Sequence, residues 1–578
     1  SVPEPDTAPD TNLDGRDVGT TLWQLLCDRW LLLALAGLLG MLLTASALLP
    51  QLPGQLQEEP AAADRWLTAT TDAFGAVGPW LRSLGLFNVL HSPQFRVLLV
   101  TAIFVLLVQT ANAVLVAVRY RRLPAALDQS SQPGGEPVPL HMPVRVLRWR
   151  DAFPAAKEVA RPHWLGGLLP TPGLRQAQAP DGTPLYLLDY PHYFDRGGNP
   201  YLGPEGRDWL DNHLRFGLLS RVAAWLGSEA TTLNWRPDVV HCNDWQTGLA
   251  PAYMAYLPAR HAKSLFTLHN LAFQGLFDHA ALFELGLPDH AWSYDGVEYY
   301  GYLSFLKAGL QHASAINTVS PTYAREIQTD AEGMGMAGLL RHRSDRLSGI
   351  LNGIDSKVWN PATDRHLVQT YGPRRLEGKA ANKATLQVQL GLEARPELPL
   401  FAVVSRLTEQ KGLDLLLEVA PQLLALPAQL VVLGSGSHGL EQQWLALAQR
   451  HRRQCAVIVG FDETLAHRIE AGADVFVMPS RFEPCGLNQM YSLRYGTPPV
   501  VRATGGLADT VIDAGDERHG NGFVFEQATG EALMQALRRA AAAWADPPRW
   551  HKLQQRGMAR DFSWTGAARQ YADLYRTL

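Results

Sequence analysis

A short segment late in the chain, Pro479–Tyr491 (PSRFEPCGLNQMY), combines an acidic residue with a turn that opens a helix. Glu483 lies just before the expected helix start near Gly486. Free backbone N–H groups and the positive end of the helix dipole favour an anion or a polar ligand there. A glutamate at this place could also serve only to cap the helix. The proline, cysteine and glycine around it favour a shaped turn, so we interpret Glu483 as a ligand-binding residue.

Two cations follow another expected strand, in the segment Ser405–Lys411 (SRLTEQK). Arg406 and Lys411 could clamp a diphosphate, with the arginine as a bidentate fork and the lysine as a point charge. The alternative is an ordinary solvated loop, and this segment alone does not decide between them.

A third loop, Ala503–Asp509 (ATGGLAD), follows the next strand along the chain. Its residues Thr504, Gly505 and Gly506 allow the backbone to approach a phosphate closely. Two glycines after a strand are weak evidence alone. Their position one strand after Glu483 strengthens the indication.

Polar side chains also end two strands in the first half of the chain. His269 ends a strand in LFTLHNLAFQG, and Asp244 follows another in HCNDWQ. The end of a strand is a usual place for a functional side chain, although such a histidine could also be a hydrogen-bonded packing residue. His241, Cys242 and Asp244 lie on one strand end with spacing that is poor for a metal ion, so no metal site is predicted.

These motifs belong to an alternation of apolar strands and amphipathic helices that starts near residue 182. The late strands are expected at Leu400–Val404, Leu430–Leu433, Ala456–Val459, Val475–Met478, Pro499–Val501 and Phe523–Phe525. Helices are expected between them, such as Leu413–Leu424 and Leu440–Gln449. Earlier strands are expected at Tyr186–Leu188, Val239–Cys242, Leu265–His269 and Ala315–Val319. The pattern predicts two α/β sheets, each with its functional side chains at the carboxyl edge.

Composition excludes several classes of protein. The chain has 578 residues, 47% of them hydrophobic, which is enough for more than one core and argues against a disordered protein. The formal net charge of −4 gives no basic excess for nucleic acid. Four cysteines, none spaced as CxxC, exclude a disulfide scaffold and disfavour a structural zinc site.

The first 122 residues differ from the rest. Two uncharged apolar runs, Trp30–Leu49 and Val97–Val118, are each long enough to span a bilayer, and a basic cluster follows the second. They predict two transmembrane helices in residues 1–122, an inner-membrane location with membrane lipid as a partner, and a cytoplasmic remainder after a linker at 123–181. TLWQLLCDRW, LLPQLPGQ and LRSLGLFNVLHSPQFRVLL also resemble the first spans of the ResB family of cytochrome c biogenesis proteins.

From about residue 182 to 578 the chain resembles bacterial glycogen (starch) synthases, the retaining glucosyltransferases of glycosyltransferase family 5. The resemblance is carried by LDYPHYFDRGGNPY, PDVVHCNDWQTGLAPAY, FTLHNLAFQG, INTVSPTYAREI, LSGILNGID, FAVVSRLTEQKGLDL and PSRFEPCGLNQMYSLRYGTPPVVRATGGLADTV. It implies the GT-B fold, with a partial N-terminal domain at 182–390 and a nucleotide-sugar-binding domain at 391–578. It further implies transfer of glucose from ADP-glucose to the 4-hydroxyl of an α-1,4-glucan, with retention and without a metal or cofactor.

The resemblance also implies roles for individual residues. Arg406 and Lys411 would bind the ADP phosphates. Glu483 would hold the glucose hydroxyls, and His269 and Asp244 would orient the sugar and acceptor. The other substrate-binding positions implied are Asn352, Phe461 against the adenine, the backbone of Cys485, Gly486 and Leu487, and Thr504, Gly505 and Gly506 at the phosphate end.

One part of the family pattern is absent. The family begins with a strand and a K-x-G-G-L loop, but here the first lysine is Lys157, and the early GGL at Gly166–Leu168 lacks that context. We therefore expect an incomplete N-terminal GT-B domain with low or no activity. The alternatives are an inactive membrane-anchored fusion of a ResB-like fragment with a degenerate synthase, and two reading frames joined by an assembly error.

Overall fold

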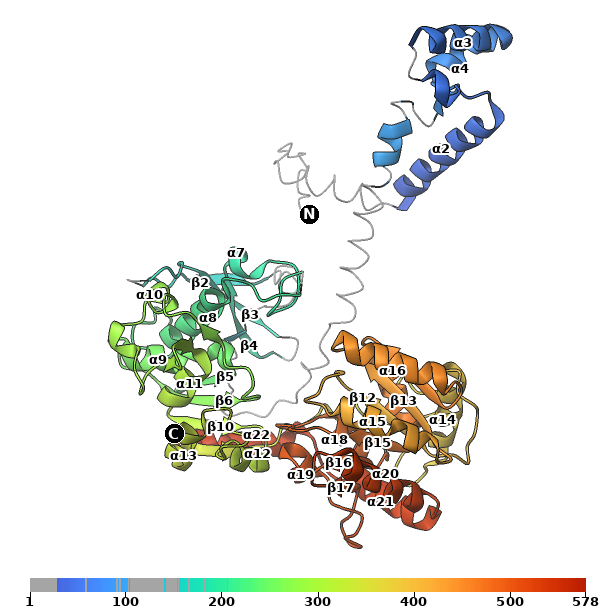
Figure 1. Cartoon of the computed structure of the whole chain (residues 1–578). Helices are drawn as coiled ribbons and strands as arrows, with labels where there is room; N and C mark the ends of the chain where they lie inside the picture. Colours follow the sequence, from blue (N-terminus) through green and yellow to red (C-terminus); the bar gives the residue numbers. More distant parts are fainter. Residues whose placement is uncertain are drawn as a thin grey trace, which may run out of the picture. The chain divides into compact units, whose positions relative to one another are not determined.

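The computed structural model describes the chain in two compact units, residues 1–124 and 125–578. Within them it describes residues 29–57, 60–89, 92, 95–101, 103, 140–141, 153, 155–164, 167–179, 182–204 and 206–578. In the second unit we call residues 140–349 the N-terminal lobe and residues 350–578 the C-terminal lobe (Figure 1).

The first unit consists of helices in the part described. They are α2 (Arg29–Leu48), α3 (Pro60–Ala73), α4 (Gly78–Ser83), and the short 3-10 turns η1 (Gly54–Leu56) and η2 (Gly75–Val77). The Gln51 side chain connects the chain after α2 to the segment after α4, because it donates to the Leu86 carbonyl at 2.9 Å and accepts from Val89 N at 3.1 Å. Phe87 is buried beside it. The segment between the two predicted spans thus folds back on itself.

The predicted inner-membrane location is wrong for the part of the chain that the structure describes. No helix within the described ranges is both long and apolar enough to cross a membrane. The predicted lipid partner likewise has no support among the described residues. Most of the second predicted span, 97–118, lies outside the described residues.

The C-terminal lobe is built on a six-stranded parallel sheet with the order β14-β13-β12-β15-β16-β17 (Figure 1). Its strands are β12 (Leu400–Val404), β13 (Gln429–Gly434), β14 (Cys455–Val459), β15 (Val475–Met478), β16 (Pro499–Arg502) and β17 (Phe523–Phe525). All six agree with the predicted strands to within one residue at each end. The order reverses between β12 and β15, and ligands of doubly wound sheets bind at the carboxyl ends of such neighbouring strands.

Helices cover both faces of this sheet, which is why its strands are apolar throughout. They are α14 (Glu377–Gln389), α15 (Leu413–Leu424), α16 (His438–Arg450), α17 (Glu463–Gly472), α18 (Asn488–Arg494), α19 (Gly505–Thr510), α20 (Gly530–Trp544) and α21 (Pro547–Ala559). The last helix, α22 (Trp564–Arg576), contacts the N-terminal lobe instead. In β12, Phe401 packs with α15, α16 and α20, and Ala402 packs with α14 and α17. Helix α14 therefore belongs to this core, although it precedes the expected domain boundary at 391.

The N-terminal lobe contains two four-stranded sheets where one was predicted. The parallel sheet β11-β10-β6-β5 contains β5 (Val239–Asn243), β6 (Lys263–Leu268), β10 (Ala315–Thr318) and β11 (Leu347–Gly349). The mixed sheet β1-β4-β3-β2 contains β1 (Leu140–His141), β2 (Lys157–Ala160), β3 (Gly173–Gln178) and β4 (Pro184–Asp189). The predicted strand Tyr186–Leu188 exists, but it pairs antiparallel with β3 because a tight turn at Gly182 (φ 89°) reverses the chain. Regular strands therefore begin before residue 182.

Helices and a small sheet surround the two sheets of this lobe. The helices are α7 (Pro191–Phe194), α8 (Asn212–Leu226), α9 (Leu249–Tyr256), α10 (Ala281–Glu284), α11 (Phe305–His312), α12 (Pro321–Glu326) and α13 (Ala337–His342). The small sheet contains β7 (Leu276–Phe277), β8 (Glu298–Tyr299) and β9 (Tyr302–Ser304), and η5 (Trp245–Thr247), η6 (Asp289–Ala291) and η7 (Ser344–Arg346) are 3-10 turns. Within the described residues β5 is an edge strand of its sheet.

Substitution of two glycines with the same backbone conformation can test how closely the loop after β12 approaches the loop after β15. Gly412 (φ 68°) would place a Cβ atom 1.9 Å from the Pro479 carbonyl, whereas Gly391 (φ 69°) has open space around it. The left-handed conformation costs alanine about 1–2 kcal/mol at either position. We expect Gly412→Ala to lower the thermal unfolding midpoint clearly more than Gly391→Ala. Equal shifts in calorimetry would contradict the close approach of the two loops.

Candidate active site

The C-terminal lobe holds a buried ion pair at the ends of two neighbouring strands. The Lys411 ammonium, after β12, lies 2.5 Å from Oε2 of Glu483, after β15. The Glu483 side chain is only 6% exposed, and the Ser480 hydroxyl donates to the same oxygen at 3.1 Å. Because a buried carboxylate needs a cation and donors, this pair fixes both loops. Two residues predicted to act together are thus in contact.

Arg481, which the sequence analysis missed, ties the same two loops together. Its guanidinium forms a bidentate pair with Asp414 at 2.6 and 2.7 Å and donates to the Glu409 carbonyl, and its backbone N–H donates to the Gln410 carbonyl. Its place two residues before Glu483, in a motif already singled out, was the available signal. Rigid support of this kind keeps Lys411 and Glu483 in register.

The turn after Glu483 has the shape that the sequence indicated. Gly486 has a positive φ of 69°, and Leu487 is the N-terminal residue that precedes α18. Cys485 is buried, and this burial raises the pKa of its thiol to about 12 even though the backbone N–H of Asn352 points at it. Cys485 is therefore an uncharged packing group. The structure brings the predicted residues Asn352 and Cys485 together.

The loop 504–506 packs on this turn. Gly506 N lies 3.2 Å from the carbonyl oxygens of Glu483 and Pro484, and Gly505 N donates to the Glu326 carboxylate at 3.0 and 3.1 Å. That Thr504 and these glycines bracket a phosphate stays a prediction. The glycines are needed because a Cβ on either would lie about 2 Å from the carbonyl of Glu483 or Cys485.

A second cluster lies at the carboxyl ends of β5 and β6 in the N-terminal lobe. The Asp244 carboxylate accepts from the backbone N–H of His269 at 2.8 Å, and His269 Nε2 lies 2.9 Å from Oδ1 of Asn243. Asp244 has φ 58° and ψ 179°, which residues other than glycine rarely adopt, and burial raises its pKa. Strained backbone held by specific hydrogen bonds is frequent at functional sites. The analysis of the sequence did not single out Asn243, which is the partner of the histidine ring.

His241 and Cys242 have packing roles. His241 lies 2.6 Å from Thr267 Oγ1 and 2.8 Å from the Tyr575 hydroxyl, and burial lowers its pKa to about 4. Burial raises the pKa of Cys242 to about 12, so its thiol stays protonated.

Two predicted ligand residues are exposed on the C-terminal lobe. Arg406 has its guanidinium near the Gln410 side-chain oxygen at 3.4 Å, and Phe461, after β14, is 68% exposed. Neither side chain belongs to the core, and their roles in ligand binding stay predictions.

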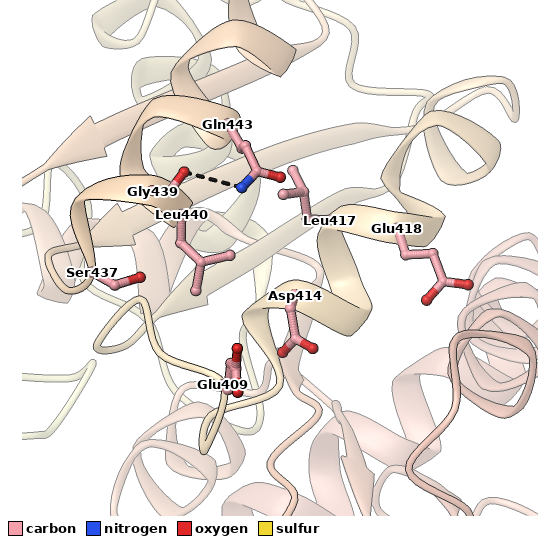
Figure 2. Close-up of a pocket in the computed structure, with 8 residues that line it drawn as sticks. All are labelled: Glu409, Asp414, Leu417, Glu418, Ser437, Gly439, Leu440 and Gln443. Atoms are coloured by element: carbon pink, nitrogen blue, oxygen red, sulfur yellow. Dashed lines mark hydrogen bonds between the residues drawn. The ribbon is translucent and has the colours of Figure 1, made fainter.

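A pocket beside these loops is acidic, in contrast to the basic side chains Arg406 and Lys411 (Figure 2). Its lining residues are Glu409, Asp414, Leu417, Glu418, Ser437, Gly439, Leu440 and Gln443. Of its three carboxylates, Asp414 is paired with Arg481, and Glu409 and Glu418 leave the pocket acidic.

Comparison with known families agrees with this geometry. The family described as starch synthase catalytic domain matches residues 146–342, and the family described as glycosyl transferases group 1 matches residues 391–557. The first match begins upstream of residue 182, as the strands do. Residues 21–122, with their predicted resemblance to ResB proteins, lie outside both.

Individual proteins are similar over most of the chain. Glycogen synthase of Dechloromonas aromatica is 57% identical over 458 residues, which is 78% of this chain and 93% of that protein. Glycogen synthase of Nitrosospira multiformis is 53% identical over 71% of this chain and 84% of that protein. The solved catalytic domain of starch synthase IV from Arabidopsis thaliana, bound to ADP and acarbose, has a TM-score of 0.65 and 32% identity, and covers 73% of this chain and 87% of that one. This likeness supports the GT-B fold.

The ion pair of the C-terminal lobe can be tested by a double-mutant cycle. Removing one partner leaves the other buried without compensation, which costs about 3–5 kcal/mol. We expect Lys411→Met and Glu483→Gln each to destabilise the lobe, and the double variant to be more stable than the sum of the two losses predicts. Additive losses in denaturant unfolding would contradict a direct pair.

His241 makes stability depend on pH in a defined direction. Its pKa is about 4 when folded, against 6.5 for an exposed histidine, so only the unfolded chain binds this proton between those values. Stability therefore falls as the pH falls from about 6.5 to about 4, by at most about 3 kcal/mol. We expect His241→Asn to show a shallower fall in unfolding free energy over this window. An unchanged slope would contradict the assignment.

Proposed function

The chain belongs to the glycogen synthase family of glucosyltransferases, and from that premise we propose that it transfers glucose from ADP-glucose to the 4-hydroxyl end of an α-1,4-glucan with retention of configuration. The observation that carries the proposal is the contact between Lys411 and Glu483, which joins a cation for the donor's phosphates to an acceptor for its sugar hydroxyls. The ADP and acarbose in the starch synthase IV structure support this choice of donor and of glucan acceptor.

The donor's diphosphate is bound by Arg406 and Lys411. Lys411 uses one direction of its ammonium for Glu483, which leaves further N–H bonds for phosphate oxygens. Arg406 is exposed and its forked guanidinium suits a diphosphate. Negative charge grows on the departing ADP as the glycosidic bond breaks, so these two cations lower the barrier most at that moment.

The glucose is held by Glu483 and by the backbone N–H groups of the turn that follows it. Carboxylate oxygens accept from sugar hydroxyls, while the amides of Cys485, Gly486 and Leu487 donate to them. Asn352, whose N–H is near Cys485, borders this turn. The exposed Phe461 ring offers a face for the adenine to stack on.

The acceptor is oriented by His269 and Asp244. Within the described part of the chain no carboxylate is placed as an obvious nucleophile. A front-face route is therefore favoured, in which the departing phosphate oxygen takes the proton from the acceptor 4-hydroxyl as the new C1–O bond forms. The acceptor hydroxyl loses its proton and the C1–phosphate bond breaks on the same face of the sugar. Catalysis then comes from orientation and from stabilised phosphate charge.

The reaction is proposed to need no metal ion and no cofactor. Arg406 and Lys411 supply the positive charge that a divalent cation supplies in many phosphate-transferring enzymes. ADP is the leaving group and the acceptor hydroxyl is the nucleophile. The transfer therefore requires no oxidant, no reductant and no base other than the departing phosphate.

The alternative of an inactive fusion is not favoured, because the chain covers 93% of the Dechloromonas aromatica relative. The absence of the K-x-G-G-L loop remains the reason to expect reduced activity. The resemblance of residues 21–122 to ResB proteins stays a prediction to which we attach no function.

The proposal is tested by incorporation of labelled glucose from ADP-glucose into glycogen by the full chain. We expect incorporation by the wild type with or without EDTA, release of the label by an α-1,4-specific amylase, and a loss of about 100-fold or more in Lys411→Met and Glu483→Gln. Lys552→Met, which changes an exposed lysine on α21, is the matched control and should be unaffected. A folded wild-type chain that incorporates nothing, or a Glu483→Gln variant with full activity, would contradict the proposal.

A further inference from the structure

Two carboxylates join the lobes where α12 meets α19. Glu326, at the end of α12 in the N-terminal lobe, accepts from Gly505 N at 3.0 and 3.1 Å and from the Thr504 hydroxyl at 3.3 Å. Asp509, in α19 of the C-terminal lobe, accepts from the Ser320 hydroxyl, from Thr322 N at 3.2 Å and from the Thr322 hydroxyl at 2.6 Å. Each lobe thus supplies an acid to the first turn of the other lobe's helix.

This arrangement satisfies backbone donors that each helix leaves open at its start. Thr504 precedes α19 but its own side chain does not cap that helix, and the Glu326 carboxylate takes that role from across the interface. Negative charge at the start of a helix is favourable. The two contacts therefore stabilise one relative position of α12 and α19.

The two helices are also connected to both halves of the proposed active site. On the N-terminal side, the buried Tyr323 of α12 accepts from Leu271 N at 3.1 Å, two residues after His269. On the C-terminal side, Gly506 of α19 lies with its N–H 3.2 Å from the Glu483 carbonyl. A continuous set of contacts runs from the His269 loop through α12 and α19 to the Glu483 turn.

The C-terminal helix α22 contacts the same part of the N-terminal lobe. The Asn317 amide, three residues before Ser320, donates to the Tyr571 hydroxyl at 2.9 Å, and the Tyr575 hydroxyl lies 2.8 Å from His241 Nδ1. The segment 316–327 is thus held by the C-terminal lobe both at Asn317 and at the α12–α19 contact. It is the INTVSPTYAREI motif, to which the sequence analysis assigned no role.

We propose that Glu326 and Asp509 are positioning residues that set His269 and Glu483 in register across the two lobes. The inference rests on the proposed function, because it concerns the geometry of that same site. Neither carboxylate contacts substrate in this proposal. We call the contact between α12 and α19 the joint. When the joint is loosened, each lobe keeps its own half of the site, so the C-terminal lobe still binds the donor while the acceptor is misaligned.

The kinetic test compares Glu326→Ala and Asp509→Ala with Asp330→Ala. Asp330 lies just after α12 and pairs with Arg341 inside the N-terminal lobe, so its loss removes a nearby carboxylate without touching the joint. Misalignment of reacting groups lowers turnover, so we expect kcat to fall about tenfold or more in the first two variants, with the KM for ADP-glucose within about twofold, and no change in Asp330→Ala. Glu326→Gln, which can still accept from Gly505 N–H, should recover part of the kcat. An unchanged kcat in Glu326→Ala would overturn the proposal.

A second readout does not depend on activity and so separates this proposal from the proposed function. Amide hydrogen exchange of the full chain is followed at 505–510 and at 269–273. We expect Glu326→Ala to speed exchange in both segments, because the joint couples them, and Asp330→Ala to change neither. Faster exchange at 505–510 alone would overturn the coupling even if the wild-type chain made no glucan.

Discussion

The buried carboxylate of Glu483 is the constraint on which the arrangement of the C-terminal lobe depends. Burial without a cation is costly, so Lys411 must reach it from the neighbouring strand. The chain can turn from Lys411 into α15 only because Gly412 adopts a positive φ and passes close to the Pro479 carbonyl. The parallel pairing of β12 with β15 brings the two loops to one edge. The ion pair therefore depends on a glycine, on the pairing of two strands and on the way the chain enters α15.

Charge around this pair is distributed unevenly, and the distribution selects the ligand. Glu409 and Asp414 line an acidic pocket next to the loop, while Arg406 and Lys411 belong to the same loop. Arg481 neutralises Asp414, so the acid on that side does not cancel the cations. The N-terminal lobe differs, because burial raises the pKa of Asp244 and its carboxylate accepts a backbone N–H. One lobe is suited to a charged donor and the other to a neutral, hydroxylated acceptor.

The local sequence pattern predicted the helices and strands of the C-terminal lobe well, but it predicted contacts between distant residues poorly. The strands of the C-terminal lobe and the helix Leu413–Leu424 have the predicted bounds because both faces of that sheet are buried. Lys411 and Glu483 could be named from residue type and strand ends. The partner of Gly505 could not be predicted, because Glu326 lies far away in the sequence. A glycine-containing loop, taken by itself, resembles a phosphate-binding loop. Apolar length alone also predicted an inner-membrane location, which is wrong for the described residues, whereas the second predicted span lies mostly outside them. The strand β4 was assigned to the wrong sheet because its pairing direction is set by its neighbour.

Each lobe organises its own half of the site from local contacts, so nothing within either half sets the distance between His269 and Glu483. That distance must be set where the lobes touch, and such contacts must be strong enough to persist yet separate from the substrates. Carboxylates that accept backbone and hydroxyl donors across an interface meet both requirements, since they satisfy groups that would otherwise be orphaned. Glu326 and Asp509 act at opposite ends of the same contact. Sliding one helix along the other would therefore break both sets of bonds together, which gives the joint a single preferred register.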